Sequence, residues 1–153
     1  MNSAVEKALY RTTAVIFEEL CFILPHSVDK VIGNEPSVGA VVSFNGPFSG
    51  KLLVRVTRNI MPVLSANMLG DDEPPDARME QDAIGEIANV ICGNLLPTIA
   101  GAEAIFHLES PVFFEGFLPA GTGAPLRSEA EIHIGLDSGK ADVVLYVADG
   151  SLR

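Results

Sequence analysis

The twenty residues DAIGEIANVICGNLLPTIAG, positions 82 to 101, constrain the fold more than any other stretch of this sequence. An α-helix turns about 100° per residue, and apolar side chains recur here with that period, so we predict a helix from about residue 79 to residue 100. Its apolar face carries Ile84, Ile87, Ala88, Ile91 and Leu95, which we expect to pack against a sheet. Pro97 is expected to kink this helix or to end it early.

The opposite face of the same helix carries Asp82, Glu86, Asn89 and Gly93. A polar stripe of this kind usually does no more than face water. Glu86 and Asn89, however, are three residues apart, so they are neighbours on one surface and can contact one external target together. Asp82 lies near the expected start of the helix, where a carboxylate also complements the helix dipole.

Small and apolar residues flank this polar stripe, which favours a contact surface over a merely solvated face. Gly85 and Gly93 each cost a helix about 1 kcal/mol relative to alanine, and they leave room for another chain to approach closely. Cys92 and Leu96 adjoin the stripe as well, so we expect the outward face to be unusually apolar. An apolar patch with a polar centre is typical of a protein interface.

The rest of the chain predicts a two-layer α+β fold. Strand pairs joined by short loops favour a mostly antiparallel sheet, and we expect the long helices to pack on one face of it. The whole chain, residues 1–153, is expected to form a single domain. Helices are predicted at 4–23 and 58–70, a charged loop at 71–78, a second loop at 119–127, and strands at 37–46, 51–57, 103–110, 111–118, 128–136 and 140–148.

Composition excludes several classes of partner. A formal net charge of -10 and a pI of about 4.6 make nucleic acid and anionic membranes poor partners. We see neither an apolar run long enough to cross a bilayer nor a secretory signal. Cys21 and Cys92 lack the spacing of a redox or metal motif and are expected to be buried thiols. These observations favour a cytoplasmic protein without a cofactor of its own.

Other common site chemistries find little support. His26, His107 and His133 are dispersed, and no group of His, Cys and carboxylate residues has the spacing of a metal site. The sequence has no G-x-S-x-G motif around a serine. The GTG triplet at residues 121–123 lacks the strand–turn–helix context of a phosphate loop.

The pattern D-x-x-x-E-x-x-N-x-x-x-G-N, from Asp82 to Asn94, resembles the signature of the CheC/CheX/FliY phosphatases of bacterial chemotaxis. The resemblance extends over nearly the whole chain, because the long first helix, the hairpin, the acidic loop and the terminal strands follow the CheX order. No second E-x-x-N occurs in the sequence. One such site per chain is similar to CheX, whereas CheC carries two.

This resemblance implies a function. Members of the family dephosphorylate the response regulator CheY, so the expected activity is hydrolysis of an aspartyl phosphate on a CheY-like receiver that holds its own Mg²⁺. It implies that Asn89 positions the attacking water and that Glu86 contacts the receiver's active-site lysine. Asp82, Gly85 and Gly93 are expected to contact the partner. The resemblance also implies a homodimer, and the Val-rich terminal strand DVVLYVA is a candidate for edge-to-edge pairing.

Two alternatives to an enzyme stay open. The chain could dock a receiver, or a second copy of itself, as a scaffold without catalysis, because a motif alone does not establish a rate. A weaker alternative is a ligand-sensing domain with a pocket against the sheet.

Overall fold

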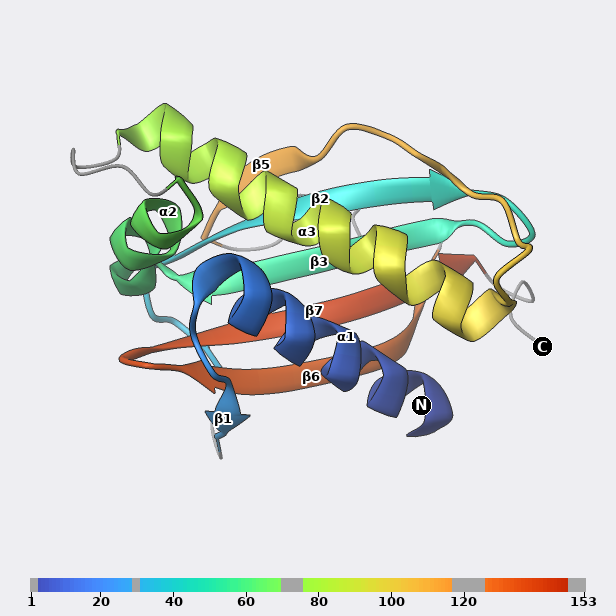
Figure 1. Cartoon of the computed structure of the whole chain (residues 1–153), viewed down its shortest axis with the longest axis horizontal. Helices are drawn as coiled ribbons and strands as arrows, with labels where there is room; N and C mark the ends of the chain where they lie inside the picture. Colours follow the sequence, from blue (N-terminus) through green and yellow to red (C-terminus); the bar gives the residue numbers. More distant parts are fainter. Residues whose placement is uncertain (1–2, 29–30, 70–75, 117–125, 149–153) are drawn as a thin grey trace.

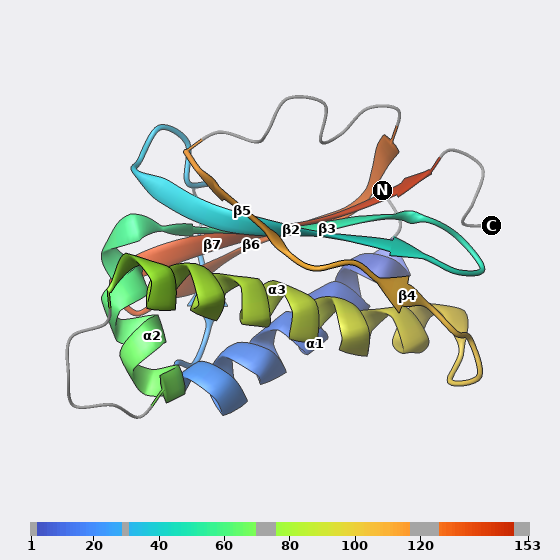
Figure 2. The ribbon, with the colours of Figure 1, turned by 90° about the horizontal axis from the view of Figure 1, so that it is seen from above.

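The computed structural model describes residues 3–28, 31–69, 76–116 and 126–148. One sheet forms one layer, and the helices form the second layer on a single face of it (Figure 2). The predicted two-layer α+β architecture is therefore confirmed. The elements in chain order are α1 Ser3–Cys21, β1 His26–Ser27, β2 Ser37–Asn45, β3 Gly50–Thr57, the 3₁₀ helix η1 Arg58–Ile60, α2 Met61–Leu69, α3 Ala77–Ala100, β4 His107–Leu108, β5 Val112–Glu115, β6 Leu126–Leu136 and β7 Gly139–Ala148.

The sheet is antiparallel throughout, with the strand order β1-β6-β7-β3-β2-β4, and β5 also pairs with β2. The hairpin expected between the strands at 37–46 and 51–57 forms as β2 with β3, and the strands predicted at 128–136 and 140–148 pair as a second hairpin, β6 with β7. The expected edge-to-edge pairing of the strand DVVLYVA is wrong. It belongs to β7, which lies between β6 and β3 and has its backbone groups bonded on both sides (Figure 1).

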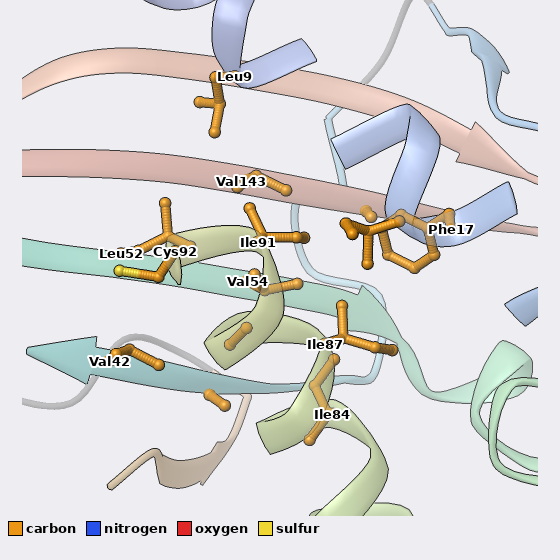
Figure 3. Packing of buried hydrophobic residues seen from close by; sticks show 14 of the residues in the cluster. Leu9, Phe17, Val42, Leu52, Val54, Ile84, Ile87, Ile91, Cys92 and Val143 are labelled. Carbon is orange, nitrogen blue, oxygen red and sulfur yellow. The ribbon is translucent and has the colours of Figure 1, made fainter. Parts of the chain in front are cut away.

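The core lies between the sheet and the two long helices (Figure 3). Alternate residues of β2, such as Val38, Ala40 and Val42, point to the helix side and are buried there. From α3, Ile84, Ile87 and Ile91 meet them and are fully buried. The side chains that alternate along the strands and the side chains that recur every 3.6 residues along the helix therefore meet in one apolar layer.

Helix α1 ends at Cys21, two residues before the predicted end. Phe22 adopts a left-handed conformation with φ of 56°, and the Ile23 N–H donates to the Phe17 carbonyl at 3.2 Å. This bond reaches back six residues along the chain, and the left-handed Phe22 that it spans occupies a place where glycine is usual at helix ends. The Asn67 side chain donates to the carbonyl of Cys21 at 2.7 Å and so ties α2 to the same turn.

Helix α3 begins at Ala77 and continues through Pro97 to Ala100. Asp76 caps its start, because its carboxylate accepts the N–H of Met79 at 2.9 Å. Of the loop predicted at 71–78, residues 77 and 78 are therefore helical, and residues 71–75 lie outside the described parts. The helix is not ended early by Pro97, since the Gly101 N–H still donates to the Pro97 carbonyl at 2.9 Å.

By length and composition alone, α3 is apolar enough to cross a membrane. The prediction that no apolar run reaches that length is therefore wrong by these criteria. Half of the most apolar stretch of α3 is buried within this fold, and its isoleucines pack on the sheet. Core helices of globular domains have the same composition.

The segment after α3 departs most from the sequence prediction. Residues 103–110 form only the two-residue strand β4, and β5 covers four residues of the strand predicted at 111–118. The chain returns along α3 towards the start of that helix (Figures 1 and 2). The Glu109 N–H donates to the Ser43 carbonyl at 2.9 Å, which attaches this return segment to β2. Of the loop predicted at 119–127, residues 126 and 127 belong to strand β6, and residues 119–125 lie outside the described parts of the chain.

Candidate functional site

A groove of about 480 Å³ runs along the outward side of α3. Asp82, Gly85, Glu86 and Asn89 line it from the helix, so the structure brings together four of the five predicted site residues. The opposite wall is the return segment, Leu108–Pro111, and Gln81 completes the lining. We refer to this feature as the acidic groove. It forms because α3 presents its polar stripe to the side on which the chain comes back.

Asn89 is half-buried in this groove, and its amide has no hydrogen-bonding partner among the described residues. Asn94, five residues further along the same helix, behaves differently. Its side chain donates to the Val90 carbonyl at 2.7 Å. An uncharged amide both donates and accepts hydrogen bonds, so the free amide of Asn89 is available to orient an external molecule.

The acidic groove owes its charge to Asp82, Glu86 and Glu109. Glu86 and Asp82 are exposed, and neither carboxylate makes an ion pair within the described parts of the chain. No lysine or arginine lies among the described lining residues. The groove is therefore suited to a cationic group of a partner, and charge-assisted hydrogen bonds to a carboxylate are among the stronger polar contacts.

Asp82 does not support the start of the helix, which is one of the two roles expected for it. The helix begins at Ala77, so Asp82 lies in the second turn, and the effect of the helix dipole falls off within the first turn. Asp76 as the N-cap and Glu80 in the first turn fill that role instead. Asp82 is thus left with its position on the groove.

Gly93, which belongs to the polar stripe, and Gly85, which lies beside it, have different surroundings. Gly85 is buried, and a Cβ at this position would meet Pro111 at 3.4 Å, so the return segment already occupies the space beside it. Gly93 is exposed and lies outside the acidic groove, and among the described residues a Cβ there would meet only Leu108, at 4.0 Å. Room for an approaching partner therefore exists at Gly93.

The expectation of an unusually apolar outward face is also wrong. Cys92 and Leu96 are each 1% exposed and belong to the core. The return segment runs along this side of α3, and Leu96 lines one hollow together with Ile105 and Phe106. A helical wheel cannot show this cover, because the covering residues come from later in the chain.

Sequence reasoning missed the second wall of the groove. Glu109 and Ser110 face the polar stripe across the groove, and both had been assigned to the end of a predicted strand. Their proximity to α3 follows from the path of the chain and has no local pattern. The small size of Gly85 is the one hint in the sequence that something packs there.

Other reactive groups of the described residues do not form a second centre. No group of three or more His, Cys, Asp and Glu side chains in these parts of the chain has the arrangement of a metal site. Burial raises the pKa of Cys21 and of Cys92 to about 12, so both thiols stay protonated, as expected for buried cysteines. His133 lies between Glu131 at 3.3 Å and Asp142 at 2.7 Å on the sheet, apart from the groove.

The sequence matches the model of one protein family, the chemotaxis phosphatase CheX, over residues 38–122. The chain belongs to this family. The match begins at β2 and includes the polar stripe and the return segment, so it contains both walls of the acidic groove. No curated protein matches the sequence.

Solved structures of CheX proteins have the same fold. CheX from Desulfovibrio desulfuricans is similar with a TM-score of 0.74 and 22% identity, over 94% of this chain and 99% of that one. CheX from Vibrio vulnificus gives a TM-score of 0.76 at 15% identity, over 94% and 95%. A CheX–CheY complex with BeF₃ and Mg²⁺ from Borrelia burgdorferi gives 0.65 at 16% identity, over 94% and 97%. These likenesses confirm the fold expected from the sequence.

Proposed function

We propose that this protein hydrolyses the aspartyl phosphate of a phosphorylated CheY-like receiver, and that the acidic groove is where the receiver docks. The observation that carries the proposal is that the amide of Asn89 and the carboxylate of Glu86 share one groove of a CheX-family chain and have no partner among the described residues. A CheX from Borrelia burgdorferi forms a complex with CheY, which supports a receiver as the partner.

In the proposed reaction a water attacks phosphorus, the bond from phosphorus to the aspartate oxygen breaks, and the products are the carboxylate and inorganic phosphate. Catalysis of phosphoryl transfer is mostly positioning and electrostatic stabilisation. Asn89 would hold the water in line through its amide, much as a glutamine does in GTPases. No nucleophile from this chain is required.

Glu86 would contact the active-site lysine of the receiver in a charge-assisted hydrogen bond. Asp82 and Gly93 would contact the receiver on either side of it. Gly85 would hold the groove open while its own neighbour is Pro111. The Mg²⁺ that neutralises the phosphoryl charge would belong to the receiver, and this chain needs to supply no metal ligand.

The rival function is a receiver-docking or scaffold module with the same groove and no catalysis. It predicts binding without loss of phosphate. The ligand-sensing alternative has no specific support from the groove, which is polar and lies on the surface of α3 rather than against the sheet. A homodimer and a cytoplasmic location stay predictions, and the homodimer no longer has β7 as a pairing edge.

The deciding experiment measures loss of phosphate from a phosphorylated CheY-like receiver of the same organism with Mg²⁺. The parent protein is compared with Asn89→Ala and with Asn94→Ala as the matched control on the same helix. We expect the parent and Asn94→Ala to accelerate hydrolysis and Asn89→Ala to lose about 100-fold or more of the acceleration.

Binding of the same receiver is measured in parallel. Full activity of Asn89→Ala would rule out the water-positioning role. Binding by the parent without acceleration would favour the docking module instead.

A further inference from the structure

We infer that the docked receiver also covers a second, apolar hollow next to the acidic groove, and that Ile105 is the main apolar contact there. This inference rests on the proposed function, because it takes the receiver as the occupant of the groove. It extends the site from the reactive centre to the surface that holds the partner in place.

The apolar hollow has a volume of about 300 Å³ and lies beside the second half of α3. Gly93, Leu96 and Pro97 line it from the helix, and Ala104, Ile105, Phe106 and Leu108 line it from the return segment. Ile105 is 85% exposed, more than any other large hydrophobic side chain in the described parts of the chain. A side chain so exposed contributes nothing to the core.

The apolar hollow adjoins the acidic groove. Leu108 lines both, and Gly93 follows Asn89 by one helical turn on the same side of α3. A partner that presents a reacting group to Asn89 therefore has Ile105 within the same contact surface. The exposed Gly93 leaves space between the two hollows.

The usual size of a protein interface also favours a contact surface larger than the acidic groove. Specific interfaces involve about 20–30 residues on each partner, whereas nine residues line the acidic groove. Interfaces also combine an apolar centre with polar groups around it. The acidic groove provides the polar part, and the apolar hollow is the adjoining described surface that provides the other.

Ile105 is held on a firm base. Its neighbour Phe106 packs edge-to-face on Phe44 and Phe48, with ring centroids 5.9 and 5.1 Å apart. Leu108 then pairs with Phe44 in the sheet. A contact displayed on such a base loses little conformational freedom on binding, which raises affinity.

Charge favours a receiver over a second copy of this chain as the occupant. Two copies that met through this surface would bring together the carboxylates of Asp82, Glu86 and Glu109 from both chains, and like charges in close contact are unfavourable. A receiver that offers a lysine to the groove is complementary to it.

The test compares the parent with Ile105→Ser, the conservative variant Ile105→Leu, and Leu24→Ser. Leu24 is also highly exposed, at 72%, but lies between α1 and β1, away from both hollows. The probe is a CheY-like receiver of the same organism with BeF₃⁻ and Mg²⁺. Its Kd is measured for each variant, together with the mass of the protein alone by light scattering. Hydrolysis is measured separately, with the phosphorylated receiver at several concentrations, because the BeF₃⁻ form has no phosphate to lose.

We expect Ile105→Ser to raise Kd and KM about tenfold, because it removes one apolar side chain from a buried contact. Higher receiver concentration should restore hydrolysis, and Ile105→Leu and Leu24→Ser should bind as the parent does. An unchanged Kd in Ile105→Ser would overturn the inference and leave the proposed function intact. A change in the protein's own mass with an unchanged Kd would assign the surface to self-association and also overturn it.

Failure of the proposed function would look different. If the parent binds the receiver without accelerating hydrolysis and Ile105→Ser still weakens binding, the inferred docking surface is supported and the proposed phosphatase activity is rejected. If the parent neither binds nor accelerates, both are overturned.

Discussion

One side of α3 carries Ile84, Ile87 and Ile91, all fully buried, whereas the other side carries Glu86 and Asn89, whose side-chain polar atoms have no partner among the described residues. The first side is complete within the fold, and its residues are explained by packing. The side chains of Glu86 and Asn89 make no hydrogen bond or ion pair with the described residues, so polar contacts within the fold do not explain why these residues stand there. A single helix thus separates residues that hold the fold from residues that await a partner.

Truncation on the buried side should have the largest effect on stability. We expect Ile91→Ala to lower the free energy of unfolding by about 2–5 kcal/mol, because it leaves a cavity between α3 and the sheet. Asn89→Ala should change it by less than about 0.5 kcal/mol. Denaturant unfolding measures both. Similar losses of unfolding free energy in the two variants would show that both sides of α3 contribute equally to the stability of the fold.

High pH should also act through the buried side. Burial raises the pKa of Cys92 and of Cys21 from 9.0 to about 12, so the unfolded chain loses these protons at lower pH than the folded one. The contribution of these thiols to the free energy of unfolding should be constant below pH 9 and should fall between pH 9 and pH 12. Denaturation at increasing pH measures this fall.

The control for that measurement is a variant with Cys21→Ala and Cys92→Ala, in which the alkaline loss should be smaller. The part that stays belongs to other groups, such as Tyr146, whose pKa is raised by burial and by Glu131. An equal loss in parent and variant would mean that the thiols are not shielded from water.

On the groove side, Glu86→Gln should weaken docking while the fold is unchanged. We expect KM for the phosphorylated receiver to rise about tenfold, since a charge-assisted contact becomes a neutral one. Added salt should raise KM for the parent more than for the variant. Glu18→Gln, an exposed carboxylate on α1, is the matched control. An equal salt response in parent and Glu86→Gln would argue against a charge contact at Glu86.

The smallest effect on stability is expected for a substitution at Gly93, and this substitution should stabilise the fold rather than destabilise it. Gly93→Ala should stabilise the fold by about 0.5–1 kcal/mol, because alanine favours the helix and the added Cβ would meet Leu108 at 4.0 Å and no described residue outside the helix more closely. If a partner approaches there, the same variant should bind the receiver more weakly. Gly85→Ala is the comparison, since its Cβ would contact Pro111 of the same chain. Stabilisation without any loss of binding would remove Gly93 from the docking surface.

The features that could be predicted from the sequence are those set by residues that lie close together in the chain. Helix α3 and its polar stripe were predictable because the pattern repeats within a few residues, and the hairpins β2–β3 and β6–β7 because their strands are close in the sequence. The central position of β7 was not predictable, since it depends on pairing with β3 across the intervening helices.

The same limit applies to the site. Asp82, Glu86 and Asn89 were found from helical spacing, whereas Glu109 and Ile105 were not, because they reach α3 only through the path of the return segment. The end of α1 was misplaced for a different reason. Phe22 takes a conformation that is usually left to glycine, and no helix-ending signal stands at that position.

Both walls of the acidic groove come from one uninterrupted stretch, residues 81–111, whereas α1 and the β6–β7 hairpin contribute only to the support beneath it. Such an arrangement lets the contact surface vary in evolution without disturbing the pairing of the central strands. It also makes the site transferable: exchanging this stretch between two relatives should carry the choice of partner with it, provided that β2 still accepts the incoming segment.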